Sequence, residues 1–258
     1  MNQKELKKYA RKIYEKIVNI KNSENLFHSP FKHFSIDNFF ENTFADKLEK
    51  SFPSINEDTW EKTNDPEIEV KMRTNWRSEF DVPENIIDAI RIMNSSFFLN
   101  AISDVLEIPK LMPDPYFTGG GLNLTVSGGL LDVHVDGNYH DASGLNRRVN
   151  AILYLNPEWK KGWGGEFGLY DKKGIKLMKK IAPIHNRLVV FDTNDFSFHG
   201  LPDPLNFPKG FSRKSIILYY YTKEGRPSAQ VKIKDPHSAL WRKKGWKDKR
   251  GEETRDSN

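Results

Sequence analysis

The feature that most constrains this chain is a series of short apolar runs in its second half. They are LNLTVSG (122–128), LLDVHVD (130–136), NAILYLN (150–156), EFGLYD (166–171), LVVFD (188–192) and SIILYYYT (215–222). The runs are rich in β-branched and aromatic residues, and clusters of Gly, Asn, Pro or Lys separate them, which is typical of β-strands. Because no long helical pattern separates most of these runs, an antiparallel sandwich or barrel is favoured over alternating strands and helices.

Apolar residues at helical spacing occur before these strands. The expected helices cover residues 3–21, 42–50, 83–94 and 95–108. A first strand is expected over 34–40, whereas 54–80 reads as irregular and charged apart from a short strand at 67–72. Helices with such apolar faces must pack on something broad, and the outer face of a sheet is the natural partner. The basic face of the first helix suits solvent, although a membrane surface or an acidic partner is the alternative.

The composition limits the class of protein. The chain has 258 residues and no cysteine, so disulfides, a thiolate metal site and a cysteine nucleophile are all excluded. The first thirty residues lack the uninterrupted apolar core of a signal peptide, and no apolar run is long enough to span a membrane. We therefore expect a soluble, cytoplasmic protein.

The positive charge is concentrated at the two ends of the chain. The formal net charge is +5, and residues 1–30 and 240–258 carry +4 and +3, so the part between them is slightly negative. A nucleic-acid partner is not favoured, because a basic groove would be expected in the folded body. We expect an amphipathic helix within 1–30, a folded domain over 31–225 and a basic tail over 226–258, of which 241–258 is expected to be frayed.

Two polar residues stand where the second apolar run ends. His134 and Asp136 are two residues apart, so on a strand they point to the same side. His199 follows at the end of another apolar run. Two histidines and one carboxylate on one face form the facial triad that binds Fe(II) in non-haem oxygenases. The His-x-Asp pair alone is a weak signal, since such residues often only form hydrogen bonds.

Three further residues strengthen this interpretation. Arg213 and Ser215 are two apart at the start of the last strand and therefore share a face. Tyr154 lies within an apolar strand, where its hydroxyl can reach inward. These residues raise the odds that the His-x-Asp pair and His199 form a functional site.

The segment HVDGN…RRVNAILYLN…GWGGEFGLYD…RLVVFDTNDFSFHGL…FSRKSIILYYY resembles the 2-oxoglutarate- and Fe(II)-dependent oxygenases, in particular the prolyl-hydroxylase-like branch. The resemblance covers residues from about 120 to 222. It implies an α+β, mainly β fold, a double-stranded β-helix of the jelly-roll or cupin type, with the N-terminal helices packed on the larger sheet. It also implies that the domain over 31–225 is a dioxygenase.

The resemblance assigns a role to each matching residue. His134, Asp136 and His199 would bind Fe(II), and Arg213, Tyr154 and Ser215 would bind the far carboxylate of 2-oxoglutarate. The expected reaction consumes O2, releases succinate and CO2, and hydroxylates a substrate, with ascorbate as a supporting reductant.

One position departs from the family pattern. The family commonly has a tyrosine near the C1 carboxylate of 2-oxoglutarate, and Thr125 stands there in this chain. We therefore expect Asn150 or a water molecule to serve that carboxylate. The candidate substrate contacts at the mouth of the site are Asn138, Tyr139, Arg148 and Trp76, with ordinary ion pairing for Arg148 and packing for Trp76 as the alternatives.

The substrate itself stays open at this point. A peptidyl proline, a free amino acid and a sugar or other small metabolite all fit the resemblance. A nucleic-acid demethylase of the same chemistry is disfavoured, because those enzymes carry a second arginine six residues after the first, where this chain has Tyr219. A cupin-like protein that binds metal or ligand without turnover is the alternative from another class. The oligomeric state is not predicted.

Overall fold

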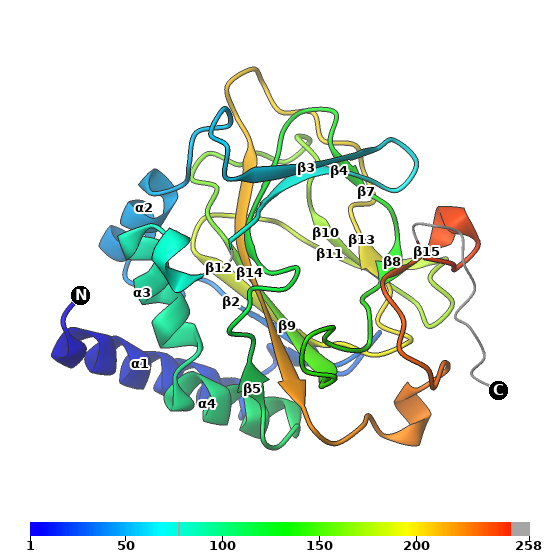
Figure 1. Ribbon diagram of the computed structural model, residues 1–258, viewed down its shortest axis with the longest axis horizontal. Coiled ribbons are helices and arrows are strands. Elements are labelled where there is room, and N and C mark those ends of the chain that lie inside the picture. Colours follow the sequence, from blue (N-terminus) through cyan, green and yellow to red (C-terminus); the bar gives the residue numbers. More distant parts are fainter. Residues whose placement is uncertain (77, 249–258) are drawn as a thin grey trace.

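Two antiparallel sheets form the body of the protein in the computed structural model, which describes residues 1–76 and 78–248 (Figure 1). The larger sheet runs in the order β1 (Leu26–Phe27), β2 (His33–Ile36), β12 (Arg187–Asp192), β9 (Asn146–Tyr154), β14 (Arg213–Thr222), β6 (Gly121–Thr125), β4 (Glu69–Thr74) and β3 (Trp60–Asp65). Two short strands extend it, β5 (Met112–Pro113) beside β14 and β7 (Leu130–Leu131) beside β4. The smaller sheet runs in the order β11 (Leu177–Ile181), β10 (Phe167–Tyr170), β13 (His199–Gly200), β8 (His134–Val135) and β15 (Leu240–Trp241).

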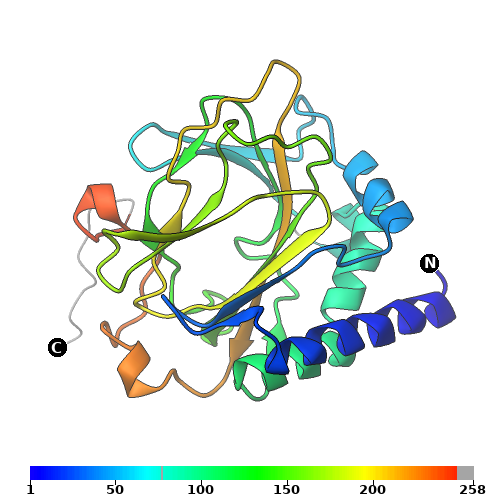
Figure 2. The ribbon, with the colours of Figure 1, turned by 180° about the vertical axis from the view of Figure 1, so that it is seen from behind.

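Helices cover the outer face of the larger sheet (Figures 1 and 2). They are α1 (Gln3–Val18), α2 (Asn42–Lys50), α3 (Glu84–Met93) and α4 (Ser96–Leu106). The short 3-10 helices are η1 (Asn19–Asn22), which follows α1, η2 (Glu79–Asp81), which precedes α3, and η3 (Ser228–Gln230) and η4 (Arg242–Lys244), which lie in the C-terminal segment on the opposite side of the molecule from α1–α4. The side chain of Asn2 caps α1 and that of Ser95 caps α4, as expected for these residue types. All four predicted α-helices are present, and they pack where the sequence predicted.

The two faces of the larger sheet bury different apolar clusters. On β9, Ala151 and Leu153 belong to the cluster under the helices, whereas Ile152 and Tyr154 belong to a cluster with Phe167 between the two sheets. This alternation follows from the two-residue period of a strand. Two facing antiparallel sheets with helices on the larger one confirm the predicted double-stranded β-helix.

The predicted strand over 130–136 is divided between the two sheets. β7 pairs with β4 in the larger sheet, and β8 pairs with β13 in the smaller one. Between them, the carboxylate of Asp132 accepts hydrogen bonds from the Arg242 side chain and from the Lys243 backbone N–H. The chain therefore changes sheets immediately before His134, and this crossing places that residue beside β13.

Two segments differ from expectation. Residues 60–65 form β3, an edge strand in a region predicted to be irregular, paired with β4 from Trp60 to Asp65. The C-terminal segment is also not frayed throughout, because Leu240 and Trp241 form β15 and are only 6% and 2% exposed. Residues 249–258 of the predicted tail lie outside the described part of the chain, and the domain limits at 30 and 225 stay a prediction. No helix among the described residues is long and apolar enough to cross a membrane.

Candidate active site

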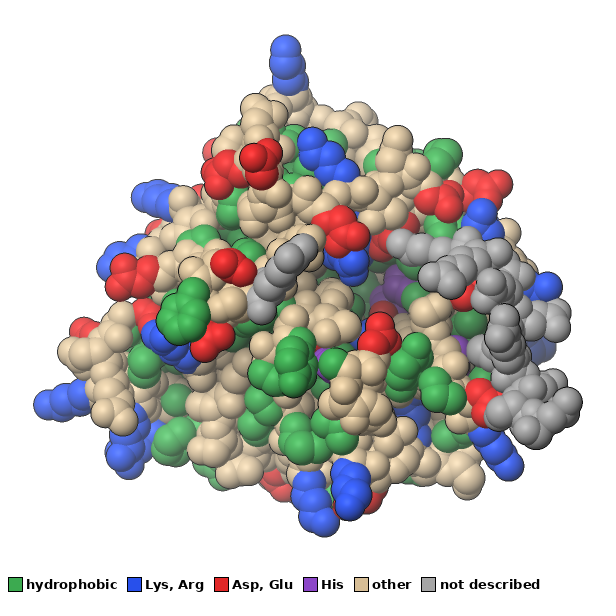
Figure 3. All heavy atoms as spheres, viewed as in Figure 1, with side chains coloured by type: hydrophobic (Ala, Val, Ile, Leu, Met, Phe, Trp, Pro, Cys, Tyr) green, Lys and Arg blue, Asp and Glu red, His purple; other side chains and the backbone are tan. Residues whose placement is uncertain are grey.

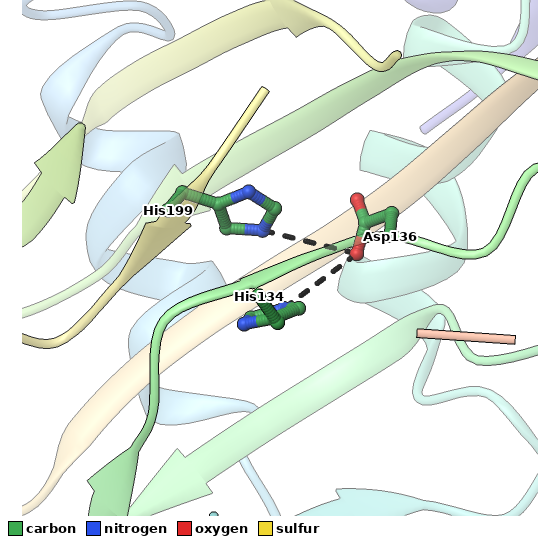
Figure 4. A group of neighbouring side chains, drawn as sticks. All are labelled: His134, Asp136 and His199. Atoms are coloured by element: carbon green, nitrogen blue, oxygen red, sulfur yellow. Dashed lines mark ion pairs between the residues drawn. The ribbon is translucent and has the colours of Figure 1, made fainter. Parts of the chain in front are cut away.

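The structure brings His134, Asp136 and His199 together between the two sheets (Figure 4). One potential ligand atom from each residue lies within 4.8 Å of the other two, and all three side chains are buried. Oδ1 of Asp136 lies 3.7 Å from Nε2 of His134 and 3.8 Å from Nε2 of His199. The two histidines are direct partners across β8 and β13. Figure 3 shows histidine atoms within a hollow on the face seen in that view.

Hydrogen bonds orient both imidazole rings. Nδ1 of His134 lies 2.9 Å from the carbonyl oxygen of Asp132, and Nδ1 of His199 lies 2.8 Å from that of Ser197. A carbonyl oxygen only accepts, so each Nδ1 carries the proton and each Nε2 keeps a free lone pair. Burial and the neighbouring His199 lower the pKa of His134 to about 3, so this ring is neutral at neutral pH. Neutral imidazoles with free Nε2 atoms are suited to metal binding.

Asp136 is held in its charged form and in one orientation. Burial opposes its ionisation, but the neighbouring groups outweigh burial and hold the pKa of the carboxyl below its usual value, and of these groups Arg147 is the one that carries a permanent positive charge. Nδ2 of Asn150 donates a 3.1 Å hydrogen bond to Oδ2, which leaves Oδ1 facing the two imidazoles. Two neutral nitrogens and one carboxylate oxygen at these separations fit a divalent iron ion with further coordination positions left for other ligands.

A second polar group lies beyond the apolar cluster that contacts the triad. Rings of Phe167 and Phe191 lie 5.3 and 5.0 Å from that of His199, and Tyr154 belongs to the same cluster. Arg213 donates to the Tyr154 hydroxyl at 3.1 Å and to the Gly165 carbonyl at 2.9 Å.

Arg213 is only 7% exposed, and no acidic side chain pairs with it among the described residues. The hydroxyl of the neighbouring Ser215 is buried without a partner. A buried guanidinium without a counter-charge, beside two hydroxyl groups, fits the carboxylate of a ligand such as 2-oxoglutarate.

The structure gives the neighbours of Thr125 and Asn150, whose role toward the C1 carboxylate of 2-oxoglutarate stays a prediction. Thr125 is the partner of Arg213 across β6 and β14, so its backbone lies at the arginine end of the site. Asn150 binds Asp136 through its nitrogen, and its Oδ1 is buried without a partner. Asn150 is therefore first of all a support for a metal ligand, and this contact was not foreseen from the sequence.

A β-bulge separates two adjacent arginines. Tyr220 pairs with Val149 while Tyr221 pairs with Arg147, so Arg148 is an extra residue on β9. Arg147 faces the metal site, where its guanidinium lies 4.0 Å from the centre of the Tyr219 ring. Arg148 instead lines a different pocket. The arginine on the side of the metal site is therefore Arg147 and not Arg148, which the sequence analysis had named. The bulge that turns the two side chains to different sides has no signature in the sequence.

The other candidate substrate contacts have structural partners. Asn138 donates to the carbonyl oxygen of Asp235 and accepts from the backbone N–H of His237. Tyr139 forms an isolated bridge with Asn146, so its backbone is fixed next to Asp136. Trp76 is 6% exposed and packs edge-on against Phe117 at 5.7 Å.

The C-terminal segment contributes a residue that the sequence analysis missed. Trp241 is the β15 partner of His134, and its ring stacks on the imidazole at 4.4 Å with an angle of 25°. Asp132 holds the next two residues, as described above. The isolated apolar pair Leu240–Trp241 within a basic stretch was the only sign of this contact in the sequence.

The comparisons with known proteins point to the same class of site. Residues 120–221 match the 2OG-Fe(II) oxygenase superfamily. The prolyl 3-hydroxylases OGFOD1 of Mus musculus and Xenopus laevis are 35% and 39% identical to this chain over 86 residues. Residues 120–221 are therefore similar to the 2-oxoglutarate- and Fe(II)-dependent oxygenases, and the curated relatives that match this segment are prolyl hydroxylases. Fe(II) and 2-oxoglutarate are the cofactor and the co-substrate of these oxygenases, and the triad and Arg213 offer groups for both.

Solved structures show the same fold. A Pseudomonas putida prolyl-4-hydroxylase superposes with a TM-score of 0.56 at 17% identity, and covers 81% of this chain and 98% of its own. A prolyl 4-hydroxylase of Phytophthora capsici gives 0.57 at 20% identity, over 89% of this chain and 70% of its own. The match to the two curated relatives covers 32% of this chain and 15% and 16% of their lengths, so it concerns one segment of those proteins.

Proposed function

We propose that this protein is a 2-oxoglutarate-dependent dioxygenase that hydroxylates a prolyl residue of a peptide. The observation that carries the proposal is the convergence of His134, Asp136 and His199, together with an unpaired Arg213 in the same interior. With Fe(II) and 2-oxoglutarate bound, this chemistry inserts one oxygen atom of O2 into a substrate C–H bond and releases succinate and CO2.

The residues of the chain would divide the work as follows. The triad would hold the iron, with Asn150 keeping Oδ2 of Asp136 turned away from the metal position. Arg213 would bind the far carboxylate of 2-oxoglutarate, with the Tyr154 and Ser215 hydroxyl groups as further donors. The surrounding phenyl rings exclude water from this end, which strengthens each charge interaction.

In this proposal the substrate binds at the end of the site where the guanidinium of Arg147 lies over the ring of Tyr219. A guanidinium is suited to a peptide carbonyl, to which it can donate hydrogen bonds. Position 219, where nucleic-acid demethylases carry a second arginine, is a tyrosine in this chain. The relatives named above are a prolyl 3-hydroxylase and a prolyl-4-hydroxylase, which supports a prolyl substrate over a free amino acid or a sugar.

A direct test combines succinate release with mass analysis of the substrate. The iron-loaded protein is incubated with 2-oxoglutarate, ascorbate and a library of proline-containing peptides, and each peptide is repeated with alanine in place of proline. We expect succinate in step with the mass gain of one oxygen atom, only for proline peptides. Asp136→Ala should abolish both signals, whereas Asp104→Ala, at an exposed surface ion pair, should keep them.

The other outcomes separate the remaining functions. Succinate formed with free amino acids or nucleotide sugars, but with no peptide, would keep the dioxygenase and reject the prolyl substrate. Bound iron without turnover of any of these substrates would support a cupin-like binding protein instead.

A further inference from the structure

The pocket to which the bulge directs Arg148 is lined by none of the triad residues and not by Arg213. It has a volume of about 460 Å³ and lies where β12 ends, beside the C-terminal end of α4 and η3. Phe31, Leu106 and Phe196 give it apolar walls, and Arg148, Asp192 and Lys172 are its main charged residues without an ion pair. Its size is within the range of pockets that hold small metabolites. The proposed reaction uses none of these residues.

Arg148 is buried without the partners that a guanidinium normally has. It is 6% exposed, its Nε has no hydrogen-bond partner, and none of its nitrogens forms an ion pair with a described residue. The carboxylate of Asp192 attracts the Arg148 guanidinium but forms no ion pair with it. Oδ2 of Asp192 already accepts a 2.6 Å hydrogen bond from the side chain of Gln230. A buried charge without a partner is strongly unfavourable, so this guanidinium is poised for an anion from outside the chain.

The remaining charges of the pocket leave an excess of positive charge. Lys32 is paired with Glu107, and on the adjoining segment Arg226 is paired with Asp195. Lys172 is exposed at the rim and forms no ion pair among the described residues. One cation at the floor and one at the rim face the same space, as in sites that bind carboxylate or phosphate groups.

We propose that this pocket is a second ligand site, which binds a small oxyanion, the carboxylate or phosphate group of a metabolite. Arg148 binds the oxyanion at the floor and Lys172 screens its charge at the rim. The volume beyond the oxyanion accommodates the body of the ligand against Phe31 and Leu106. Arg148 shows the same two signs as Arg213, burial and no acidic partner, but it belongs to a separate pocket.

The test is a titration of the full chain followed by amide NMR, which locates each bound anion. The probes are inorganic phosphate, glycerol 3-phosphate and acetate, each compared with chloride at equal ionic strength. We expect saturable shifts at Lys172, Asn194 and Ala229, which line the pocket. Saturation by inorganic phosphate identifies free phosphate as sufficient, whereas tighter binding of glycerol 3-phosphate or of acetate identifies a larger phosphoester or a carboxylate.

Variants assign the binding to these side chains. Arg148→Gln should weaken binding at least tenfold, and Lys172→Gln roughly two- to fivefold. Arg147→Gln, the adjacent residue on the other face, and Arg213→Gln should leave the shifts of this pocket unchanged. Lys172 is exposed, so its variant keeps the fold and decides the question even where Arg148→Gln is unstable. Shifts equal to those in chloride, or undiminished affinity in Lys172→Gln, would overturn the proposal.

Discussion

Trp241 offers the most discriminating test of how the C-terminal segment serves the metal site. Its indole stacks on the imidazole of His134, and Trp241→Ala removes this contact while leaving the triad intact. An aromatic pair contributes about 0.5–1.5 kcal/mol beyond its buried area. Without this support the imidazole loses orientation, so the affinity for Fe(II) should fall by roughly two- to tenfold. Loss of a buried indole should also lower the free energy of unfolding by about 3–5 kcal/mol.

Trp246 provides a matched control for this experiment. It lies on the same segment, and its ring packs at a tilt against that of Phe198 at 4.7 Å and not against a metal ligand. Both alanine variants should lower the free energy of unfolding measured in urea. Only Trp241→Ala should weaken anaerobic binding of Fe(II), measured by calorimetry, and Trp241→Phe should restore most of the affinity. Equal Fe(II) affinities in both alanine variants and the wild type would refute a positioning role for Trp241.

Three further perturbations test other parts of the site. Arg213→Gln should raise the KM for 2-oxoglutarate by a factor of roughly 30 or more, because losing a buried charged partner costs about 2 kcal/mol or more; an unchanged KM places the co-substrate elsewhere. Asn150→Ala should weaken Fe(II) binding about 10- to 100-fold by freeing Asp136, whereas Asn123→Ala, equally buried but without a bond to the triad, should not. Burial lowers the pKa of His33 to about 4, below its unfolded value, so stability is lost as pH falls below about 6.5. His33→Gln should reduce the loss of unfolding free energy between about pH 7 and pH 5 by about 2 kcal/mol, and an unchanged loss in urea titrations would contradict this assignment.

The spacing of apolar residues along the chain was sufficient to predict most of the fold. The helices and the principal strands form where apolar residues recur at the helical or strand period. β3 was missed because its sequence, WEKTND, has one buried residue and five that are exposed or half-buried. An edge strand of this kind is defined by its partner β4, and pairing is not visible in a single segment.

The site was predictable where side chains follow strand alternation. His134 and Asp136, and Arg213 and Ser215, lie where a two-residue period places them. Arg147 and Arg148 were not separable, because the bulge that divides them depends on the register between β9 and β14. Trp241 was missed for a related reason, since its burial depends on a strand partner about a hundred residues earlier.

The central claim is that His134, Asp136 and His199 hold one iron ion on which the reaction depends. The most direct measurement is an anaerobic titration of the metal-free chain with Fe(II), followed for the wild type and for Asp136→Ala, with circular dichroism to confirm that both are folded. One Fe(II) per wild-type chain, and loss of that binding in the folded variant, is the predicted result. Equal stoichiometry and affinity in both proteins would contradict the claim, because the metal would then be held elsewhere.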